Sequence, residues 1–450
     1  MMLLKTDIKQ SIIQKFKNLF LPILIEQVFM MLIMNVNVFL ISSVNDQAIA
    51  LTGLTDQIIA IGQLLLGIVS LGSTILFLQN ADKDHLDYIR KIFQQSLLLN
   101  GLLSLLIILV FAIFGRHLLQ LINSPANLIE TGNIYLQLLG WSLLPLGISS
   151  SVNALLRSYG KVRAAMYASI LNTLIVVSGN AFVVYTHLLD NAVIGIGIAT
   201  LIMRCLGVFI SLLILKKYLP KIFELKWSFH LEDLKISSKI LRLGIPSAME
   251  NVFYNISQLL ITAGIASLGV VSLSSRIYTQ TITAIIFTVS VAAGQSSQIL
   301  IGKAIRKEDM DQGTATGRST VKAFFSLSVI LNVIIALLGP LLIQIFTEDE
   351  AIKQTVTILL WLSIFYDPFR ASNEILIANL NVVGDVRYPV IVGVLTTYLF
   401  TVPVSLSLIY FFNQGLIAVW FVFIIDEALR AAIFYRRWTQ KKWLLSSNLT

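Results

Sequence analysis

Residues 245–253 read IPSAMENVF, and residues 21–29 read LPILIEQVF. The two stretches share a proline at the second position, a glutamate at the sixth and a valine and phenylalanine at the end. Glu250 of the later stretch lies 224 positions after Glu26 of the earlier one. A carboxylate at the middle of a bilayer costs at least ~2.5–3.5 kcal/mol on insertion scales, so its recurrence within two apolar segments needs a reason.

A second pair of stretches has the same spacing. VGDVR at 383–387 lies 224 residues after YGKVR at 159–163. Two matches at one offset, more than 130 residues apart, indicate an internal duplication. We therefore predict an N-terminal six-helix lobe over 1–215, a cytoplasmic linker over 216–240 and a C-terminal six-helix lobe over 241–450.

The composition is that of a membrane protein. Of 450 residues, 56% are hydrophobic and only 13% are charged, whereas soluble domains have roughly 25% charged residues. Apolar runs such as 97–114 and 323–346 reach the ~18–20 residues that cross a hydrocarbon core as a helix. We predict an all-α polytopic membrane protein with twelve transmembrane helices in two six-helix lobes, related by pseudo-two-fold symmetry. The predicted helix centres lie near residues 31, 65, 103, 143, 175, 204, 254, 287, 331, 364, 399 and 425.

The net charge is +9, and the basic residues are distributed along the chain as the topology of a membrane protein requires. Basic residues gather before the first predicted span and after every second one, while the alternate loops hold only Arg116 and Lys353. This is the positive-inside pattern, so we predict a multi-pass protein of the cell membrane with both termini in the cytoplasm. The basic residues then reflect topology and not a nucleic-acid surface. The expected partners are the lipid bilayer and a small-molecule substrate, and we expect a monomer.

The seventh predicted span is polar on one face. At about 100° per residue, the polar residues fall within roughly 160° of arc and the apolar ones fill the opposite side. The polar face comprises Glu250, Asn251, Tyr254, Asn255, Ser257 and Gln258, and we assign Phe253 to the apolar side. Such a face must contact protein or a water-filled cavity. Hydrogen bonding between helices is the alternative for the amides, but it is a poor explanation for an unpaired carboxylate.

The tenth predicted span carries a charged stripe. Its members are Ser363, Asp367, Arg370 and Glu374. The spacing allows Arg370 to neutralise both carboxylates, which leaves one negative charge for a cation or a proton. A structural ion-pair ladder is the alternative. The last span repeats the pattern with Asp426, Glu427 and Arg430. It lies nearer the cytoplasmic end, so we favour a structural role over a role in transport.

The N-terminal half has fewer polar residues in its spans. Glu26 and Asn37 are eleven residues apart and share a helical face, as do Asn172 and Asn180, which are eight apart. We consider a cleft-lining role and interhelical hydrogen bonding for the amides.

Several function classes lack their signatures. No span carries HExxH or clustered His and Asp ligands, and no GxxxxGK[ST] loop is present. We therefore expect a transporter and not an enzyme, without an organic cofactor, driven by an ion gradient. Parallel repeats with a site near their interface are a ground plan of such transporters.

Three segments carry a family resemblance. NVFLISSVNDQAIALTGL (37–54), VAAGQSSQILIGKAIRKEDMDQG (291–313) and GDVRYP (384–389) resemble motifs of the multidrug and toxic compound extrusion (MATE) family in order and spacing. The resemblance implies an antiporter that exports organic, typically cationic and amphipathic, compounds from a cleft between two lobes in exchange for Na⁺ or H⁺.

The resemblance also implies site residues. Glu250 and Asp367 match the acidic positions that couple the ion in the C-lobe and would hold Na⁺ or exchange protons, while Asn37 and Asn180 match the N-lobe sites. Asn37 stands where many members have Asp, so we place ion coupling in the C-lobe, with Glu26 as a substitute in the N-lobe. The remaining predicted residues of the substrate cleft are Asn172, Tyr254, Asn255, Gln258, Ser363, Arg370 and Glu374.

Three alternatives remain at this stage. A lipid-linked oligosaccharide flippase shares the two-lobe plan but needs a basic cleft for pyrophosphate, and the central charges here are mostly acidic, with Arg276 and Arg370 as the main exceptions. An intramembrane enzyme and a structural or receptor role have no motif in their favour.

Overall fold

The computed structural model describes residues 2–42, 46–81, 86–121, 124–223 and 233–445. These residues form helices and connecting turns, and no strand occurs among them. Each of the twelve centres predicted from the sequence falls within a helical segment, so the predicted all-α class is confirmed.

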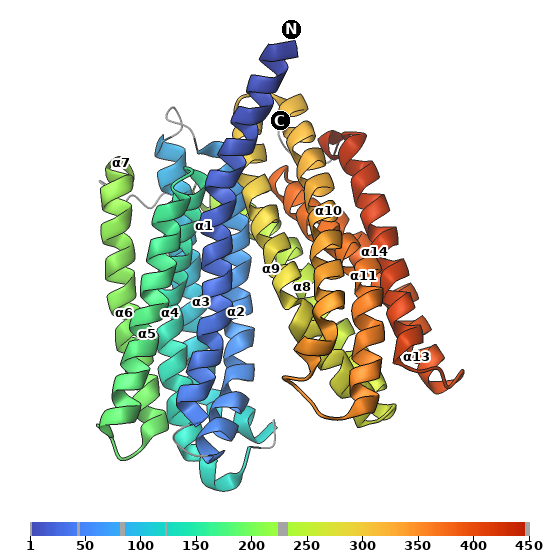
Figure 1. The fold of residues 1–450 in the computed structure, drawn as a ribbon. Helices are drawn as coiled ribbons and strands as arrows, with labels where there is room; N and C mark the ends of the chain where they lie inside the picture. The colour runs from blue at the N-terminus through green and yellow to red at the C-terminus, as the bar shows by residue number, and fades with distance from the viewer. Residues whose placement is uncertain (1, 43–45, 82–85, 122–123, 224–232, 446–450) are drawn as a thin grey trace. The chain divides into compact units, whose positions relative to one another are not determined.

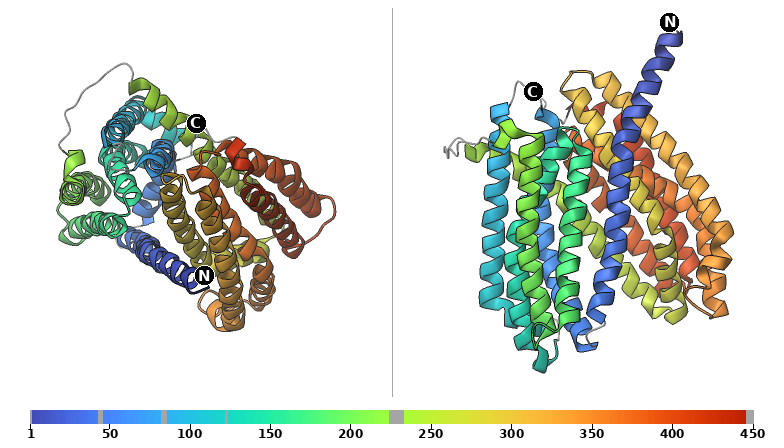
Figure 2. Two further views of the ribbon diagram at one scale, coloured as in Figure 1. Left: turned by 90° about the horizontal axis from the view of Figure 1, so that it is seen from above. Right: turned by 60° about the vertical axis from the view of Figure 1, so that its left-hand side comes forward.

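The chain divides into two compact units; apart from the dark-blue Met1–Phe20, which belongs to the second, they are coloured blue to green and yellow to red in Figure 1. The first unit is Leu21–Ile245, and the second is Pro246–Thr450 together with Met1–Phe20, so α1 and α8 are each divided between the units. In the view from above, the helices of each unit are seen nearly end on, as a bundle (Figure 2). The domain limits 1–215, 216–240 and 241–450 stay predictions.

The helices have the following bounds. Those of the first half are α1 (Met2–Ser42), α2 (Asp46–Asn80), α3 (Leu86–Leu121), η2 (Ala126–Leu128), α4 (Ile129–Ser158), α5 (Val162–Thr186), α6 (Ala192–Tyr218) and α7 (Pro220–Phe223). Those of the second half are α8 (Leu234–Ser267), α9 (Val270–Ile305), α10 (Met310–Ile343), α11 (Glu350–Val382), α12 (Arg387–Thr396), η4 (Thr397–Thr401), α13 (Val402–Tyr410), α14 (Leu416–Thr439) and η5 (Lys442–Leu445).

One helix is central in each unit. Helix α4 packs against α2, α3, α5 and α6, and α11 packs against α9, α10 and α14. Moving α4 along the chain by the repeat offset gives 353–382, which lies within α11. The two central helices are therefore copies of each other, so the duplication seen in the sequence is also present in the packing.

Nine described helical segments are long and apolar enough to cross a membrane, and α8, α11 and α14 are the long helices of the second unit that miss this criterion. Their apolar runs are interrupted by the polar and charged residues identified in the sequence. The helices that are least like simple membrane spans thus carry the predicted site. Such residues must contact protein or a water-filled cavity.

The outer surface of α10 is typical of a lipid-facing helix. Ile330, Ile334, Leu337 and Leu341 recur at steps of four and three residues and are all exposed. This spacing places them in one stripe along the helix. An exposed apolar stripe of this kind is favourable against lipid chains, whereas in water it would promote aggregation of the protein.

Two glycines allow a close backbone approach within the first unit. A Cβ atom at Gly72 of α2 would overlap the carbonyl oxygen of Ile240 in α8, and one at Gly244 would overlap the carbonyl oxygen of Ile68. The two contacts are reciprocal and involve backbone atoms, which cannot rotate away as a side chain can. Small residues are the usual means of close helix packing in membranes.

A π-helical turn interrupts the helix that spans Arg387–Tyr410. The turn covers Thr397–Thr401 (η4), and Pro403 follows it near the start of α13. Proline has no backbone N–H, so it removes one hydrogen bond of the regular helix. Short π-helical turns of this kind are frequent at functional sites.

Candidate functional site

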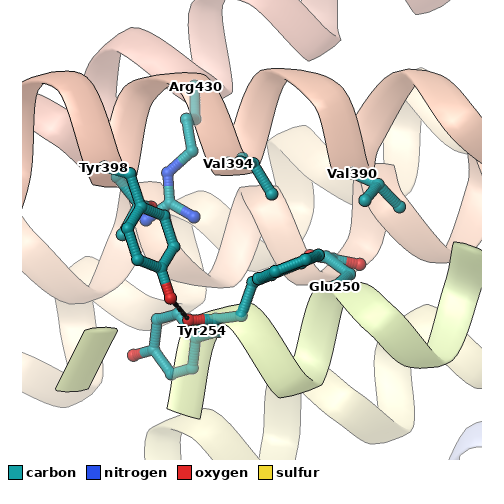
Figure 3. A pocket seen from close by; sticks show the side chains of 9 residues that line it. Glu250, Tyr254, Val390, Val394, Tyr398 and Arg430 are labelled. Carbon is teal, nitrogen blue, oxygen red and sulfur yellow. Dashed lines mark hydrogen bonds between the residues drawn. The ribbon is translucent and has the colours of Figure 1, made fainter. Parts of the chain in front are cut away.

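A small cavity of about 10 Å³, with room for about one water molecule, lies within the second unit beside Glu250. We call it the Glu250 cavity. Its lining residues come from α8, α12, η4 and α14 and are Glu250, Phe253, Tyr254, Val390, Gly393, Val394, Thr397, Tyr398 and Arg430. In Figure 3 the side chains of Glu250 and Tyr254 extend from α8, and those of Tyr398 and Arg430 come from the facing helices. The Tyr398 hydroxyl donates to the carbonyl oxygen of Phe253 at 2.9 Å.

A second small cavity, also of about 10 Å³, adjoins the same residues. We call it the Gln258 cavity. It is lined by Tyr254, Ser257, Gln258, Tyr366, Thr397, Thr401, Phe423, Asp426, Glu427 and Arg430. Tyr254, Thr397 and Arg430 line both cavities. The polar face predicted for the seventh span therefore borders enclosed space, as a polar face in a membrane must.

The face of α8 that lines the cavities is displaced from the predicted one. Phe253, which we assigned to the apolar side, lines the Glu250 cavity and packs edge-on against Tyr398 at 6.1 Å between ring centroids. Asn251 and Asn255 are exposed, and each donates to a backbone carbonyl four residues earlier in its own helix. Asn255 lines neither cavity, in contrast to Tyr254 and Gln258. The lining arc covers about 140° and is rotated away from the two asparagines.

The charged ladder predicted in the last span forms. The Arg430 Nη2 atom contacts the Asp426 carboxylate at 2.6 Å and the Glu427 carboxylate at 2.9 Å. Asn373 of α11 donates to a carboxylate oxygen of Glu427 at 2.6 Å and to its backbone carbonyl at 2.9 Å. This buried ladder also lines the Gln258 cavity, which the sequence does not indicate. Its predicted position nearer the cytoplasmic end had favoured a structural role.

The ion pairs predicted in α11 do not form. Among the described residues, Arg370 has no carboxylate within 4.0 Å of its guanidinium nitrogens. Its guanidinium instead lies over the ring of Phe287 in α9, 4.2 Å from the ring centroid. Stacking on aromatic rings suits the planar guanidinium. The spacing of residues within α11 permitted the ion pairs, but a ring on the neighbouring helix competes for the guanidinium.

Asp367 and Ser363 are both buried in α11. One carboxylate oxygen of Asp367, Oδ2, is buried without a hydrogen-bond partner. The Ser363 hydroxyl donates to the carbonyl oxygen of Leu359 at 2.9 Å. Asp367 is thus the better candidate for binding an ion, because an unsatisfied buried oxygen is costly to leave without a partner.

Glu427 is central to the charges of the second unit. It interacts electrostatically with four other carboxyl groups, namely Glu250, Asp367, Glu374 and Asp426. The buried guanidiniums nearby are those of Arg276, Arg370 and Arg430. The five carboxyl groups outnumber the three guanidiniums by two. This excess of acidic groups can be offset by protons or by metal cations.

The repeat counterparts Glu26 and Glu250 have different electrostatic partners. Glu26 is buried in α1, and its carboxylate contacts the guanidinium of Arg157 in α4 at 2.5 Å. The repeat offset carries Arg157 to position 381, which is an asparagine. Among the described residues, Glu250 has no ion-pair partner within 4.0 Å. The charge of Glu26 is therefore balanced by an arginine, whereas the charge of Glu250 is not.

This pairing predicts how Glu26 variants behave. Glu26→Gln is expected to destabilise the protein by up to ~3–5 kcal/mol, because it leaves the Arg157 charge uncompensated, and the partial exposure of Arg157 reduces that figure. Glu26→Gln/Arg157→Gln should restore much of the loss. Melting temperatures of the purified variants in detergent, at neutral pH, provide the measurement. Equal melting temperatures for the single and double variants would contradict a stabilising pair.

The two asparagines predicted in the fifth span bond to neighbouring helices. The Asn172 amide donates to the hydroxyl of Ser211 in α6 at 3.1 Å, and the Asn180 carbonyl accepts from Thr200 in α6 at 3.1 Å. Gly207 of α6 leaves space for the Asn172 side chain. Both amides thus hold α5 against α6, which is the alternative considered from the sequence. The side chain of Asn37 lies outside the described residues.

The comparison with known families matches the duplication. Residues 22–182 and 246–406 each match the MatE family. Both ends of the second match lie 224 residues after those of the first, which confirms the offset inferred from the sequence. Each match begins at the proline that precedes the glutamate, Pro22 in the first and Pro246 in the second.

Known proteins resemble the chain over most of its length. The uncharacterized transporter YisQ of Bacillus subtilis is 30% identical over 77% of this chain and 76% of its own. The probable multidrug resistance protein NorM of Halalkalibacterium halodurans is 23% identical, with the same coverage of the two chains. The crystal structure of MATE in the bent conformation superimposes with a TM-score of 0.84 over 96% of each chain, at 17% sequence identity. The chain therefore belongs to the MatE family, and it is a multi-pass membrane transporter and not an enzyme.

Proposed function

We propose that this MatE family transporter exports organic cations, chiefly amphipathic ones, in exchange for Na⁺ or H⁺ by alternating access. The observation that carries the proposal is Glu250, a carboxylate without an ion-pair partner among the described residues, at a cavity within a membrane-spanning unit. An uncompensated carboxylate there is costly unless it serves a function. The similarity to a probable multidrug resistance protein supports a role in drug export.

The proposed coupling follows from differential stabilisation. A proton or Na⁺ at Glu250 or Asp367 removes a negative charge from a buried site, so closing water out of that site costs less free energy. A ligand shifts a conformational equilibrium only by its difference in affinity for the two states. Cation binding therefore favours the conformation in which these carboxylates are least hydrated, and release of the cation favours the other.

The charge balance argues against the flippase. A pyrophosphate group requires cationic side chains that are free to bind it. Arg430 is held by two carboxylates, Arg276 donates to Gln258 at 2.7 Å, and Arg370 is stacked on Phe287. The acidic excess of this unit instead favours a cationic substrate. We further propose that both termini are cytoplasmic, that the cell membrane is the site of action and that the monomer is the working unit.

Transport in proteoliposomes tests the proposal. A fluorescent cationic dye is expected to accumulate inside vesicles when a Na⁺ gradient, a pH gradient or both are imposed, and accumulation should stop when the gradient is collapsed. Imposing the two gradients separately identifies the coupling ion. A polyprenyl pyrophosphate, added as a competitor, should leave dye transport unchanged. A dye flux that does not change when either gradient is imposed would contradict the proposed antiport. Competition by the pyrophosphate would contradict the proposed substrate class.

A further inference from the structure

Arg430 lies in the wall that the two cavities share. It is buried, and its side chain extends from α14 between Glu250 on one side and the Gln258 cavity on the other. One of its nitrogen atoms, Nη2, bonds to both Asp426 and Glu427, while Nε is buried without a hydrogen-bond partner. Five N–H groups belong to a guanidinium, so the present contacts use only part of its bonding capacity.

The carboxylates around Arg430 are also incompletely satisfied. The Oδ1 atom of Asp426 is buried without a hydrogen-bond partner, although the side chain is only 4% exposed and lines the Gln258 cavity. Glu250 lines the adjoining cavity and lacks an ion-pair partner among the described residues. The hydroxyls of Thr397 and Thr401 face the same space from η4. Oxygen atoms of this kind are the ligands that hard cations prefer.

We propose that Asp426 and Glu427 join Glu250 in binding the coupling cation of this transporter, and that Arg430 is an internal counter-ion that competes with the cation for these carboxylates. The inference rests on the proposed cation-coupled function and identifies residues that the sequence did not assign to it. In the present state Arg430 supplies the positive charge. Na⁺ or a proton replaces it when the guanidinium moves away from Asp426 and Glu427.

The present geometry fits a state in which Arg430 holds the site. Within the described part of the chain, no three acidic, histidine or cysteine side chains are arranged to hold a metal ion. A cation that binds here must therefore draw Glu250 towards the carboxylates of α14 or displace the guanidinium. A long, flexible side chain can move without rearranging the helix that carries it. Each cavity beside Arg430 has room for about one water molecule, so movement of the guanidinium also requires the lining side chains to shift.

Other charged and titratable groups also face Arg430 and enter its pH dependence. On α14 they are Asp426 and Glu427, and on the other elements they are Glu250 and Tyr254 of α8, Tyr366 of α11 and Tyr398 of η4. Glu374, Asp367 and Arg370 of α11 act through Glu427 and Glu250. A measured pH response therefore belongs to this group of residues and is assigned by comparing variants.

Cation binding to the purified protein tests the inference directly. The Na⁺ dependence of the melting temperature is measured in detergent for wild type, Arg430→Gln and Arg430→Lys, with choline chloride keeping the ionic strength constant. Arg430→Gln should lower the half-saturating Na⁺ concentration about tenfold or more, because the competing charge is gone. In Arg430→Lys the half-saturating Na⁺ concentration should remain within about threefold of the wild-type value, because lysine keeps the positive charge. For a proton-coupled protein, the midpoint of the pH response in Na⁺-free buffer should rise by about one unit in Arg430→Gln.

Arg437→Gln is the matched control. Arg437 is on the same helix and pairs with Asp385 through two contacts, at 2.5 and 3.1 Å, but it lines neither cavity. Its removal should reduce thermal stability without moving the Na⁺ or pH midpoint. Should Arg430→Gln not fold, Arg430→Met replaces it, because methionine also removes the competing charge and keeps an unbranched side chain at this position. It should also bind the cation more tightly than wild type.

The outcomes separate the two proposals. Unchanged Na⁺ and pH midpoints in folded Arg430→Gln, or in folded Arg430→Met, overturn the counter-ion role while leaving dye export by wild type intact. A shifted midpoint together with no gradient-driven dye transport by wild type supports the site and rejects the exporter. No response of wild type to either cation overturns both.

Discussion

Glu250→Gln is expected to abolish cation-driven export, leaving a dye transport rate below about one tenth of wild type in proteoliposomes. The amide has nearly the shape of the carboxyl group, so the Glu250 cavity and the Tyr398 hydrogen bond to Phe253 remain. It carries no charge and cannot take up a proton. A tenfold loss corresponds to ~1.4 kcal/mol of coupling free energy, which is small beside the cost of a charge in a bilayer.

The repeat supplies the control for this experiment. Glu26→Gln/Arg157→Gln removes the counterpart glutamate of the first unit together with its partner, so it changes the same residue type at the equivalent position. This double variant should keep at least about half of the wild-type rate. Melting temperatures and expression levels must be compared, so that lost transport is not lost protein. Wild-type export by Glu250→Gln would remove Glu250 from the coupling site.

Gly72→Ala is expected to destabilise the protein strongly, although it adds only one methyl group. The new methyl group would overlap the backbone carbonyl of Ile240, so α2 and the start of α8 must move apart. Overpacking of a core costs ~1–3 kcal/mol and more where backbone must shift. Removal of a helical glycine otherwise stabilises by ~1 kcal/mol, so the expected destabilisation opposes the intrinsic preference.

Gly67→Ala on the same helix is the matched control. A Cβ atom there meets nothing within 4 Å, so only the helical preference acts. The melting temperature should fall in Gly72→Ala and stay level or rise in Gly67→Ala. Gly244→Ala should resemble Gly72→Ala, since its Cβ atom would overlap the carbonyl of Ile68. Equal melting temperatures for the two α2 variants would show that the helices separate at little cost.

Sequence patterns predicted the helices and the duplication, and they singled out Glu250 as a candidate coupling residue. Apolar runs place most of the helices, because lipid requires backbone hydrogen bonds to close within each segment, whereas polar residues interrupt the runs of α8, α11 and α14. The repeat pointed to Glu250 because two carboxylates recur at one offset. Helical spacing gave the polar face of α8 but misplaced its edge at Phe253, whose ring packs on Tyr398 from another helix. A single helix cannot indicate which of its flanks a neighbour covers.

The errors concern partners that are distant in the sequence. Spacing within α11 suggested that Arg370 pairs with Asp367 and Glu374, but Phe287 of α9 holds the guanidinium. Arg157 reaches Glu26 across 131 positions, which no local pattern signals. One sequence clue was present all the same. Applying the offset to Arg157 gives Asn381, so the duplicated chain already contained the difference between its two glutamates.

That difference has an electrical consequence. A glutamate neutralised by its own arginine carries no net charge through the membrane field when its surroundings change, whereas Glu250 and its acidic neighbours do. One elementary charge moved across 100 mV corresponds to ~2.3 kcal/mol. Under the proposed coupling at Glu250, we expect the membrane potential, and not only the chemical gradient, to act on the transport cycle through the second half of the duplicated chain.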